Sequence, residues 1–293
     1  MKILDGKALA EQIKAEIAEE VAMIKAEGGN VPHLAAVLVG DDPASQSYVK
    51  SKVNSCYKCG FESTLIKKDD GISEEELLEI VQDLNENSDI DGFIVQLPLP
   101  AHIDENKVTL AIDPKKDVDG FHPINVGRMA QGLPTYLPAT PYGILQMIER
   151  NKIETSGKHC VVVGRSNIVG TPMSILLSRK AYPGNCTVTL AHSRTKDIGT
   201  ELRRADLVIA AIGIPHFITA DMIKKGAVVI DVGINRIEDA SRTRGYRLVG
   251  DVDFDEVAAL CSYITPVPGG VGPMTVTSLL MNTLKASRKE IYG

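Results

Sequence analysis

The sequence predicts an α/β protein of two domains, each a mostly parallel sheet flanked by helices, with a Rossmann-like second domain. Three observations predict this class. The 293 residues exceed the size at which one hydrophobic core usually stops growing. Apolar strand-like runs alternate with stretches of helical periodicity twice along the chain. A segment punctuated by proline and glycine separates the two alternations.

The first alternation begins with apolar residues at helical spacing from Leu9 to Ile24, a helix that Gly28 and Gly29 end. Strands and helices then follow in turn. Ser73 and Glu76 have the spacing of a capping box at the start of one of these helices. The predicted elements are a strand over 33–40, a helix over 45–58, a strand over 63–67, a helix over 73–87 and a strand over 92–97.

Residues 113–141 show no clear period, and a segment of this kind is usually functional or interdomain. A helix over 142–150 leads into the second alternation, with strands over 160–163, 187–190, 207–211 and 227–232. After an irregular stretch, a long amphipathic helix is expected from Pro273 to the end. Because that helix could pack back on the first lobe, we predict a discontinuous domain of 1–139 plus 274–293 and a dinucleotide domain of 140–273.

Composition excludes several classes of function. A net charge of -6 with no long basic run argues against a nucleic-acid partner, since such binding needs clustered Lys and Arg. The charged N-terminal stretch is neither a signal peptide nor a membrane span. Five cysteines without disulfide-like spacing fit a reducing compartment, so a cytoplasmic location without membrane attachment is expected.

The stretch VVVGRSNIVGTP, residues 161–172, resembles a phosphate-binding turn between a strand and a helix. It does not fit the G-x-G-x-x-G fingerprint, because Ser166 and Val169 occupy the second and third glycine positions. Gly164 would allow a sharp turn, and Gly170 would allow the helix to approach the strand. The alternative is a tight turn that binds nothing.

The strand after this turn ends in His192, Ser193 and Arg194, without the acidic residue that holds the ribose hydroxyls in NAD sites. A hydroxyl beside an arginine suits a 2′-phosphate, so NADP is favoured over NAD. The alternative is that Arg194 is a solvated surface residue. Arg165 supplies a second positive group or faces water.

The first lobe contains three polar residues that could carry chemistry. Tyr48 and Lys52 are four residues apart, hence neighbours on one helix face, where they could handle protons or simply be solvated. Gln96 ends a buried strand before a proline-broken loop, and ligands of open α/β sheets bind at such ends.

Three further segments are less specific. Asp117 and Asp119 precede a glycine, so they either form a turn or accept hydrogen bonds from a heterocycle. The segment PVPGGVGPMT from Pro266 is either a linker or a backbone surface against which a flat ligand lies. Cys56-x-x-Cys59 lacks a second pair and a nearby histidine cluster, so no metal site is expected.

Taken together, seven segments resemble those of the bifunctional methylenetetrahydrofolate dehydrogenase/methenyltetrahydrofolate cyclohydrolase family, in order and over nearly the whole chain. They are YVKSK, VQLPLP, DVDGFHPINVGRM, PATPYGI, VVVGRSNIVGTPMS, DVGINR and ITPVPGGVGPMT. The resemblance implies NADP-dependent oxidation of 5,10-methylene-tetrahydrofolate to the methenyl form, and hydrolysis of that cation to 10-formyl-tetrahydrofolate. Both reactions would use one shared cleft, and the protein would be a homodimer.

The resemblance also implies residue roles. Lys52 would be the key catalytic group, Tyr48 would hold the folate ring, Gln96 would bond to Lys52, and Asp119 would accept hydrogen bonds from the pterin. The substrate pocket would further include Val95, Leu97, Pro268, Gly269, Gly270, Val271 and Gly272. The dinucleotide would contact Gly164, Arg165, Ser166, Ser193, Arg194 and Ile234.

Three alternatives stay open. A monofunctional dehydrogenase of the same family would lack the hydrolysis, although Tyr48, Lys52 and Gln96 together favour its retention. A dehydrogenase of another small substrate, of the amino-acid or shikimate type, would need a different polar set in the first lobe. A non-catalytic NADP-sensing module would bind the dinucleotide without turning over.

Overall fold

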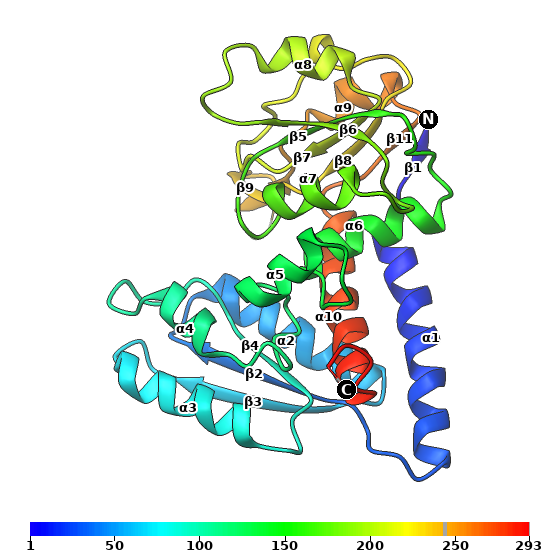
Figure 1. Ribbon diagram of the computed structural model, residues 1–293. Helices are drawn as coiled ribbons and strands as arrows, with labels where there is room; N and C mark the ends of the chain where they lie inside the picture. Colours follow the sequence, from blue (N-terminus) through cyan, green and yellow to red (C-terminus); the bar gives the residue numbers. More distant parts are fainter. Residues whose placement is uncertain (243–244, 293) are drawn as a thin grey trace. The chain divides into compact units, whose positions relative to one another are not determined.

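The computed structural model describes residues 1–242 and 245–292, and the chain divides into two compact units (Figure 1). One, named here the three-stranded unit, comprises Glu11–Ala139 and Val276–Gly293. The other, the six-stranded unit, comprises Met1–Ala10 and Thr140–Thr275. The sequence-based division placed residues 1–10 with the first domain, whereas the structure groups them with residues 140–275.

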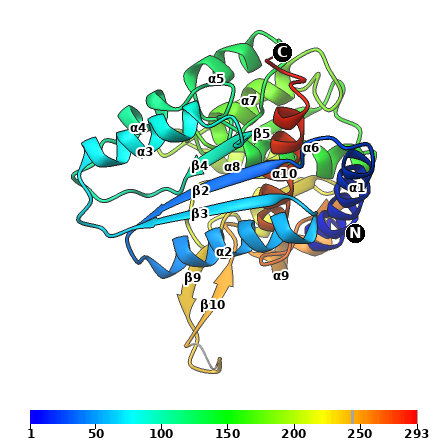
Figure 2. The ribbon, with the colours of Figure 1, turned by 90° about the horizontal axis from the view of Figure 1, so that it is seen from below.

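The three-stranded unit has a parallel sheet in the order β3-β2-β4, and Figure 2 shows helices on both of its faces. Its central strand β2 is buried at six of seven positions, as expected for a parallel strand covered on both sides. The strands are β2 His33–Val39, β3 Glu62–Lys68 and β4 Gly92–Val95. The helices are α2 Pro43–Lys58, α3 Glu74–Glu86, α4 Glu105–Ala111 and α5 Pro123–Ala130, together with residues 11–26 of α1 Gly6–Ala26.

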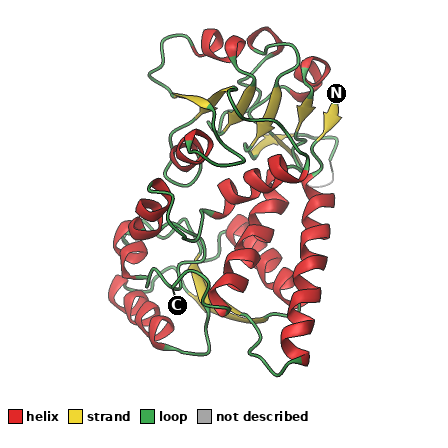
Figure 3. Ribbon diagram, turned by 45° about the vertical axis from the view of Figure 1, so that its right-hand side comes forward, coloured by secondary structure: helices red, strands yellow, loops and turns green. Residues whose placement is uncertain are grey.

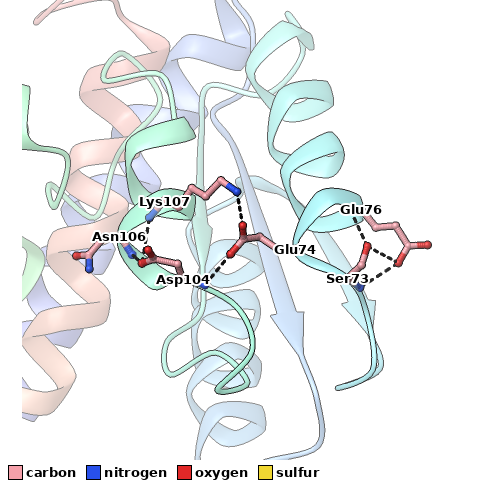
Figure 4. Close-up of polar contacts among 6 residues, drawn as sticks. All are labelled: Ser73, Glu74, Glu76, Asp104, Asn106 and Lys107. Atoms are coloured by element: carbon pink, nitrogen blue, oxygen red, sulfur yellow. Dashed lines mark hydrogen bonds and ion pairs between the residues drawn. The ribbon is translucent and has the colours of Figure 1, made fainter.

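The predicted capping box of α3 is present, and a second set of contacts joins α3 to α4 (Figure 4). The Ser73 hydroxyl accepts from the Glu76 N–H at 3.1 Å, and the Glu76 carboxylate accepts from the Ser73 N–H at 3.1 Å. Glu74 accepts the Asp104 N–H at 2.8 Å and pairs with Lys107. The cap therefore fixes the start of α3, and Glu74 fixes the start of α4 beside it.

Residues 113–141 show no clear period in the sequence, and the helix α5 that lies within them was not predicted. Pro123 is the first helical residue, and the ring Nδ1 of His122 accepts the Ile124 N–H at 3.1 Å. A helix of eight residues is about two turns, too short for periodicity to reveal.

The six-stranded unit has an all-parallel sheet in the order β1-β11-β8-β7-β5-β6, and Figure 3 shows its strands in yellow among red helices. Strand β5 lies between β6 and β7, so the strand order reverses there, as in a Rossmann fold. The main strands are β5 His159–Val163, β6 Thr187–Ala191, β7 Leu207–Ala210 and β8 Val228–Asp231. The helices are α6 Ala139–Arg150, α7 Gly170–Ser178, α8 Ile198–Arg204 and α9 Phe254–Val257, with 3₁₀ turns at Ala220–Met222 and Ala258–Leu260.

Four short strands of this unit were not predicted. Strand β1, Lys2–Ile3, pairs with β11, Tyr263–Ile264, and extends the sheet at one edge. Strands β9 Asn235–Glu238 and β10 Tyr246–Val249 form an antiparallel hairpin that projects from the parallel sheet (Figure 2). Strands β1 and β11 have two residues each, and β9 and β10 lack the continuous apolar run that marks the equally short β4, β7 and β8 in the sequence.

The last helix, α10 Val271–Ser287, is not the amphipathic helix expected from the sequence. Its polar residues Thr277, Ser278, Asn282 and Thr283 are fully buried. Asn282 donates through Nδ2 to the carbonyls of Val118 at 2.8 Å and Leu137 at 2.9 Å. Asn282 thus binds the backbone at Val118 and Leu137 within the three-stranded unit, where the sequence pattern suggested solvent.

Within the described residues, no helix combines the length and apolar character needed to cross a membrane.

Candidate functional site

Lys52 and Gln96 meet at the carboxyl end of the three-stranded sheet. Lys52 is on α2, the helix that follows β2, and Gln96 directly follows β4. The Lys52 Nζ donates to Gln96 Oε1 at 3.2 Å, and the lysine is only 8% exposed. Because β2 lies between β3 and β4, this is the point where the strand order reverses, the usual ligand position of an open parallel sheet.

Gln96 is held in a single orientation. Its backbone N–H donates to the Val37 carbonyl at 2.9 Å, and its side-chain Nε2 donates to the Leu97 carbonyl at 2.6 Å. The amide oxygen is therefore left facing Lys52. Tyr48 lies one turn before Lys52 on α2 and is 43% exposed, so its ring is available to a ligand.

Asp119, Val95 and Leu97 line one small pocket of about 20 Å³, together with Phe93 and Phe121. The structure thus brings three predicted substrate residues together beside the end of β4. Asp119 is partly exposed, and its backbone carbonyl accepts the Ala139 N–H at 3.2 Å.

For Asp117 the turn interpretation is confirmed. Its carboxylate is 2% exposed and accepts the N–H groups of Phe121 at 3.2 Å and His122 at 2.8 Å. Asn125 Nδ2 donates to the same carboxylate at 2.8 Å. Burial raises the pKa of Asp117 to about 7. Asp117 shapes the loop that carries Asp119, and its carboxylate oxygens are engaged in these hydrogen bonds.

Gly164 lies at the reversal point of the six-stranded sheet, between the ends of β5 and β7. Its φ is +120°, and a Cβ there would lie 2.0 Å from the Ala211 carbonyl oxygen. A Cβ on Gly170 would lie 2.0 Å from the Gly164 carbonyl oxygen. Both glycines are therefore required by close backbone approach, which is how a dinucleotide-binding turn is built.

The side chain of Ser166 binds backbone N–H groups at the start of α7. Its hydroxyl oxygen accepts the N–H groups of Val169 at 3.2 Å and Gly170 at 3.4 Å. The hydroxyl proton is then free to point outward, so the helix start presents an O–H donor where the common fingerprint has a glycine. Arg165 and Ser166 are both exposed.

The turn after β6 presents Ser193 and Arg194 to solvent. His192 and Thr195 hold this turn: Thr195 N–H donates to the His192 carbonyl at 2.8 Å, and His192 N–H donates to Thr195 Oγ1 at 2.9 Å. The Arg194 N–H donates to His192 Nδ1 at 3.2 Å. The sequence singled out the two presented residues but not the two that hold them.

Ile234 and the glycine-rich segment lie near each other within the six-stranded unit. A Cβ built on Gly272 would lie 3.6 Å from Cδ1 of Ile234, which is itself 46% exposed. Pro268 lines a larger pocket of about 580 Å³. Gly269 and Gly270 contact the chain's own N-terminal segment, where Lys7 N–H donates to the Gly269 carbonyl at 2.9 Å. A predicted folate residue and a predicted dinucleotide residue are thus neighbours.

Two buried carboxylates at the same sheet edge were missed by the sequence analysis. Asp231 ends β8 and is 3% exposed, and Asp251 follows β10 and is 0% exposed. Burial, with Asp251 beside it, raises the pKa of Asp231 to about 7, against the backbone N–H groups that favour the ionised form. An acid at the end of a buried strand was a signal for Asp231. Nothing local marks Asp251.

Among the residues that the structure describes, no group of three or more His, Cys, Asp or Glu side chains is arranged to hold a metal ion. Cys56 and Cys59 are buried, and Cys59 Sγ donates to the Lys14 carbonyl at 3.5 Å. Burial raises the pKa of Cys56 to about 12 and that of Cys59 to about 11, which disfavours the thiolate that a metal requires.

The geometry defines a class: a two-unit α/β protein with a Rossmann-type dinucleotide unit and a lysine-amide pair at a second sheet edge. Residues 4–119 match the family described as tetrahydrofolate dehydrogenase/cyclohydrolase, catalytic domain. Residues 138–291 match its NAD(P)-binding domain. The chain therefore belongs to the tetrahydrofolate dehydrogenase/cyclohydrolase family, and the predicted family and fold class are confirmed.

Relatives with known names are similar to this chain over nearly its full length. The bifunctional protein FolD of Bacteroides fragilis is 61% identical over 292 residues, covering 100% of both chains. The crystal structure of the bifunctional FolD of Campylobacter jejuni is 45% identical, with a TM-score of 0.92 and 99% of each chain covered. The Trypanosoma brucei enzyme, solved with an NADP cofactor and an inhibitor, is 38% identical with a TM-score of 0.92, covering 99% of this chain and 98% of its own.

Proposed function

We propose that this protein oxidises 5,10-methylene-tetrahydrofolate to 5,10-methenyl-tetrahydrofolate with NADP, and hydrolyses the product to 10-formyl-tetrahydrofolate. The observation that carries the proposal is the Lys52–Gln96 hydrogen bond of 3.2 Å at the reversal point of the three-stranded sheet. Membership of the family and the bifunctional relatives support both activities.

The first reaction removes a hydride from the carbon between two folate nitrogens and leaves a delocalised N–C–N cation. It needs alignment of the reacting carbon more than it needs a base. When bound, NADP supplies the hydride acceptor. The turn after β5 fits the phosphates of NADP, because the backbone at Gly164 leaves no room for a side chain and Ser166 presents a hydroxyl at the start of α7.

The selectivity for NADP over NAD rests on the turn after β6. Ser193 and Arg194 would bind the 2′-phosphate there, since a hydroxyl and a guanidinium both donate to phosphate oxygens. Arg165 would add positive charge near the pyrophosphate, and Ile234 would contact the nicotinamide half. The exposure of Ser193 and Arg194 supports this assignment.

The second reaction adds water to the cation and then releases a ring nitrogen, so a proton must leave the water and another must reach the nitrogen. Lys52 would serve both transfers. An amine donates an N–H to Gln96 Oε1 whether it is charged or neutral, so Lys52 keeps its position while it loses and regains a proton. Gln96 is the positioning residue of this pair.

The remaining substrate contacts follow the same assignment. Tyr48 would lie against the folate ring, and Asp119 would accept hydrogen bonds from the amino edge of the pterin. Hydrophobic walls would come from Val95 and Leu97 in the three-stranded unit. In the six-stranded unit the contacts would be Pro268, Gly269, Gly270, Val271 and Gly272.

The direct test mixes the purified protein with 5,10-methylene-tetrahydrofolate and NADP, and follows NADPH and methenyl absorbance together. NADPH without lasting methenyl absorbance indicates both activities, and accumulating methenyl indicates a monofunctional dehydrogenase. Hydrolysis of added 5,10-methenyl-tetrahydrofolate is measured separately without NADP. An NADP-sensing module would bind NADP in calorimetry and show neither reaction.

We also propose a homodimer located in the cytoplasm. The family resemblance supports the dimer, and the charged N-terminal stretch and free buried cysteines fit a reducing compartment. Light scattering during size-exclusion chromatography tests the assembly: a mass near twice the 31.6 kDa of the chain is expected, and a mass near the single-chain value would contradict it.

A further inference from the structure

Asp231 and Asp251 bind backbone from several loops at one edge of the six-stranded sheet. Asp251 Oδ2 accepts the N–H groups of Ile212 at 2.7 Å and Gly213 at 2.9 Å, in the loop after β7. Its Oδ1 accepts Nδ2 of Asn235 at 2.9 Å, at the end of the loop after β8. One buried carboxylate thus joins the loops that follow two adjacent strands.

Asp231 holds Asp251 in turn. Its Oδ1 accepts the N–H groups of Gly233 at 2.9 Å and Asp251 at 3.0 Å. Its Oδ2 accepts the Val252 N–H at 2.9 Å. The backbone on both sides of Asp251 is therefore fixed by the carboxylate that ends β8.

The surrounding backbone is built closely around these carboxylates. A Cβ on Gly233 would lie 2.2 Å from Asp251 Oδ1, and a Cβ on Gly250 would lie 1.8 Å from Asp231 Oδ2. Each glycine leaves the space that a carboxylate oxygen fills. The arrangement thus has little freedom to shift when one of its members changes.

The loops joined by Asp251 lie at the half of the sheet edge where the nicotinamide end of a dinucleotide is expected. A dinucleotide lies across the reversal point, with its adenosine ribose at the end of the strand corresponding to β6. The other half then extends over the ends of β7 and β8. Ile234, between Gly233 and Asn235, is exposed there.

We propose that Asp251 is a positioning residue for hydride transfer, which sets the loops after β7 and β8 against the nicotinamide half of NADP, and that Asp231 keeps Asp251 in place. The inference rests on the proposed NADP-dependent oxidation and deepens it. Asp251 acts through Ile212, Gly213 and Asn235, without touching the reacting atoms. Hydrolysis does not use the dinucleotide, so we expect it to depend on these loops far less than oxidation does.

The test compares Asp251→Ala with Asp251→Asn. The alanine removes every acceptor of the carboxylate, so we expect dehydrogenase kcat/KM for NADP to fall about 100-fold, as for a misplacement of roughly 1 Å. NADP binding measured by calorimetry should weaken about tenfold, the equivalent of about 1.4 kcal/mol. The asparagine keeps one acceptor for Ile212 and Gly213, and the Asn235 amide can turn to accept from it, so most activity should return.

NADP-independent hydrolysis is the internal readout, and we expect it to stay within about twofold of the parent protein in both variants. Glu256→Gln, which removes a charge from an exposed position on α9, is the matched control and should change neither activity. Equal loss of oxidation and hydrolysis in Asp251→Ala, or unchanged oxidation, would overturn the inference.

Asn235→Ala covers the case in which Asp251→Ala does not fold. It removes only the donor to Asp251 Oδ1, so oxidation should fall while hydrolysis persists. Normal oxidation in a folded Asn235→Ala variant would count against the inference. A parent protein that neither binds NADP nor oxidises the folate would instead refute the proposed function, so the two failures are distinguishable.

Discussion

At the scale of single residues, the proposed hydrolysis depends most on Lys52. We expect Lys52→Met to lower hydrolysis of 5,10-methenyl-tetrahydrofolate by at least about 100-fold, because general acid–base groups contribute roughly 10²–10⁴-fold. Methionine keeps the length and apolar stem, so the protein should fold and bind NADP. Lys50→Met, on an exposed position of the same helix, is the control. Near-normal hydrolysis in Lys52→Met would remove the assigned role.

Arg194 carries the second prediction at this scale. If its guanidinium binds the 2′-phosphate, Arg194→Ala should lower kcat/KM for NADP by about tenfold or more and leave kcat/KM for NAD nearly unchanged, since charged hydrogen bonds contribute about 1.5–3 kcal/mol. Lys196→Ala, a nearby exposed position, should not alter the ratio. A parent protein that prefers NAD would contradict the assignment of both Ser193 and Arg194.

The sequence predicted the candidate site residues that lie at a strand end or on one helix face. It did not predict the buried residues whose hydrogen bonds fix the surrounding loops. Gln96 and Gly164 follow strands directly, so position alone marked them. Asp251 became visible only in three dimensions, because Ile212 is 39 residues away along the chain. Asn282 shows the same limit: its Nδ2 donates to Val118, 164 residues away, and its pattern indicated solvent instead.

At the scale of elements, the buried Asp117 carboxyl binds the turn before α5, and its titration should make the free energy of unfolding depend on pH. Burial raises the pKa of the folded carboxyl to about 7, whereas the unfolded carboxyl loses its proton near the ordinary aspartate pKa of 3.8. The folded state thus binds more protons between these values. The contribution is therefore fully present below about pH 4 and is lost as the pH rises toward 7.

Urea unfolding of the parent protein and Asp117→Asn at pH 5 and pH 7.5 tests this point. The parent should lose stability between the two values, and the variant should lose less, because an amide does not titrate. Part of the decline should persist in the variant, since the pKa of Asp231 is also raised to about 7. Parallel pH dependences for the two proteins would show that Asp117 does not titrate in this window.

The elements themselves differ in how far a sequence predicts them. Helix α3 was predicted with its cap because Ser73 and Glu76 act locally. Helix α5 was missed because two turns give no period, and β1 because its partner β11 is about 260 residues away along the chain. Local chemistry is readable in sequence, whereas pairing across the chain is not.

At the scale of the whole molecule, the first ten residues complete the unit that contains residues 140–275. Lys2 N–H donates to the Ser262 carbonyl and Leu4 N–H to the Ile264 carbonyl, both at 2.8 Å, so the segment adds an edge strand. Gly6 then packs on the glycine-rich segment, where a Cβ would lie 1.8 Å from the Gly270 carbonyl oxygen. The N-terminal segment and residues 262–270 therefore shape one proposed folate surface.

Gly6→Ala should destabilise the protein by about 3 kcal/mol, the upper part of the usual range for overpacking, because both contacting groups are backbone. It should also raise KM for the folate, since Gly270 must shift. Gly127→Ala is the control. Gly127 lies inside α5, and apart from its chain neighbours and the backbone of its own helix no heavy atom lies within 4 Å of the added Cβ, so the change should be neutral or stabilise by up to about 1 kcal/mol. The test measures the denaturant midpoint and the KM for the folate in both variants. Equal denaturant midpoints for Gly6→Ala and the parent would mean that Gly6 does not pack closely against Gly270 in solution.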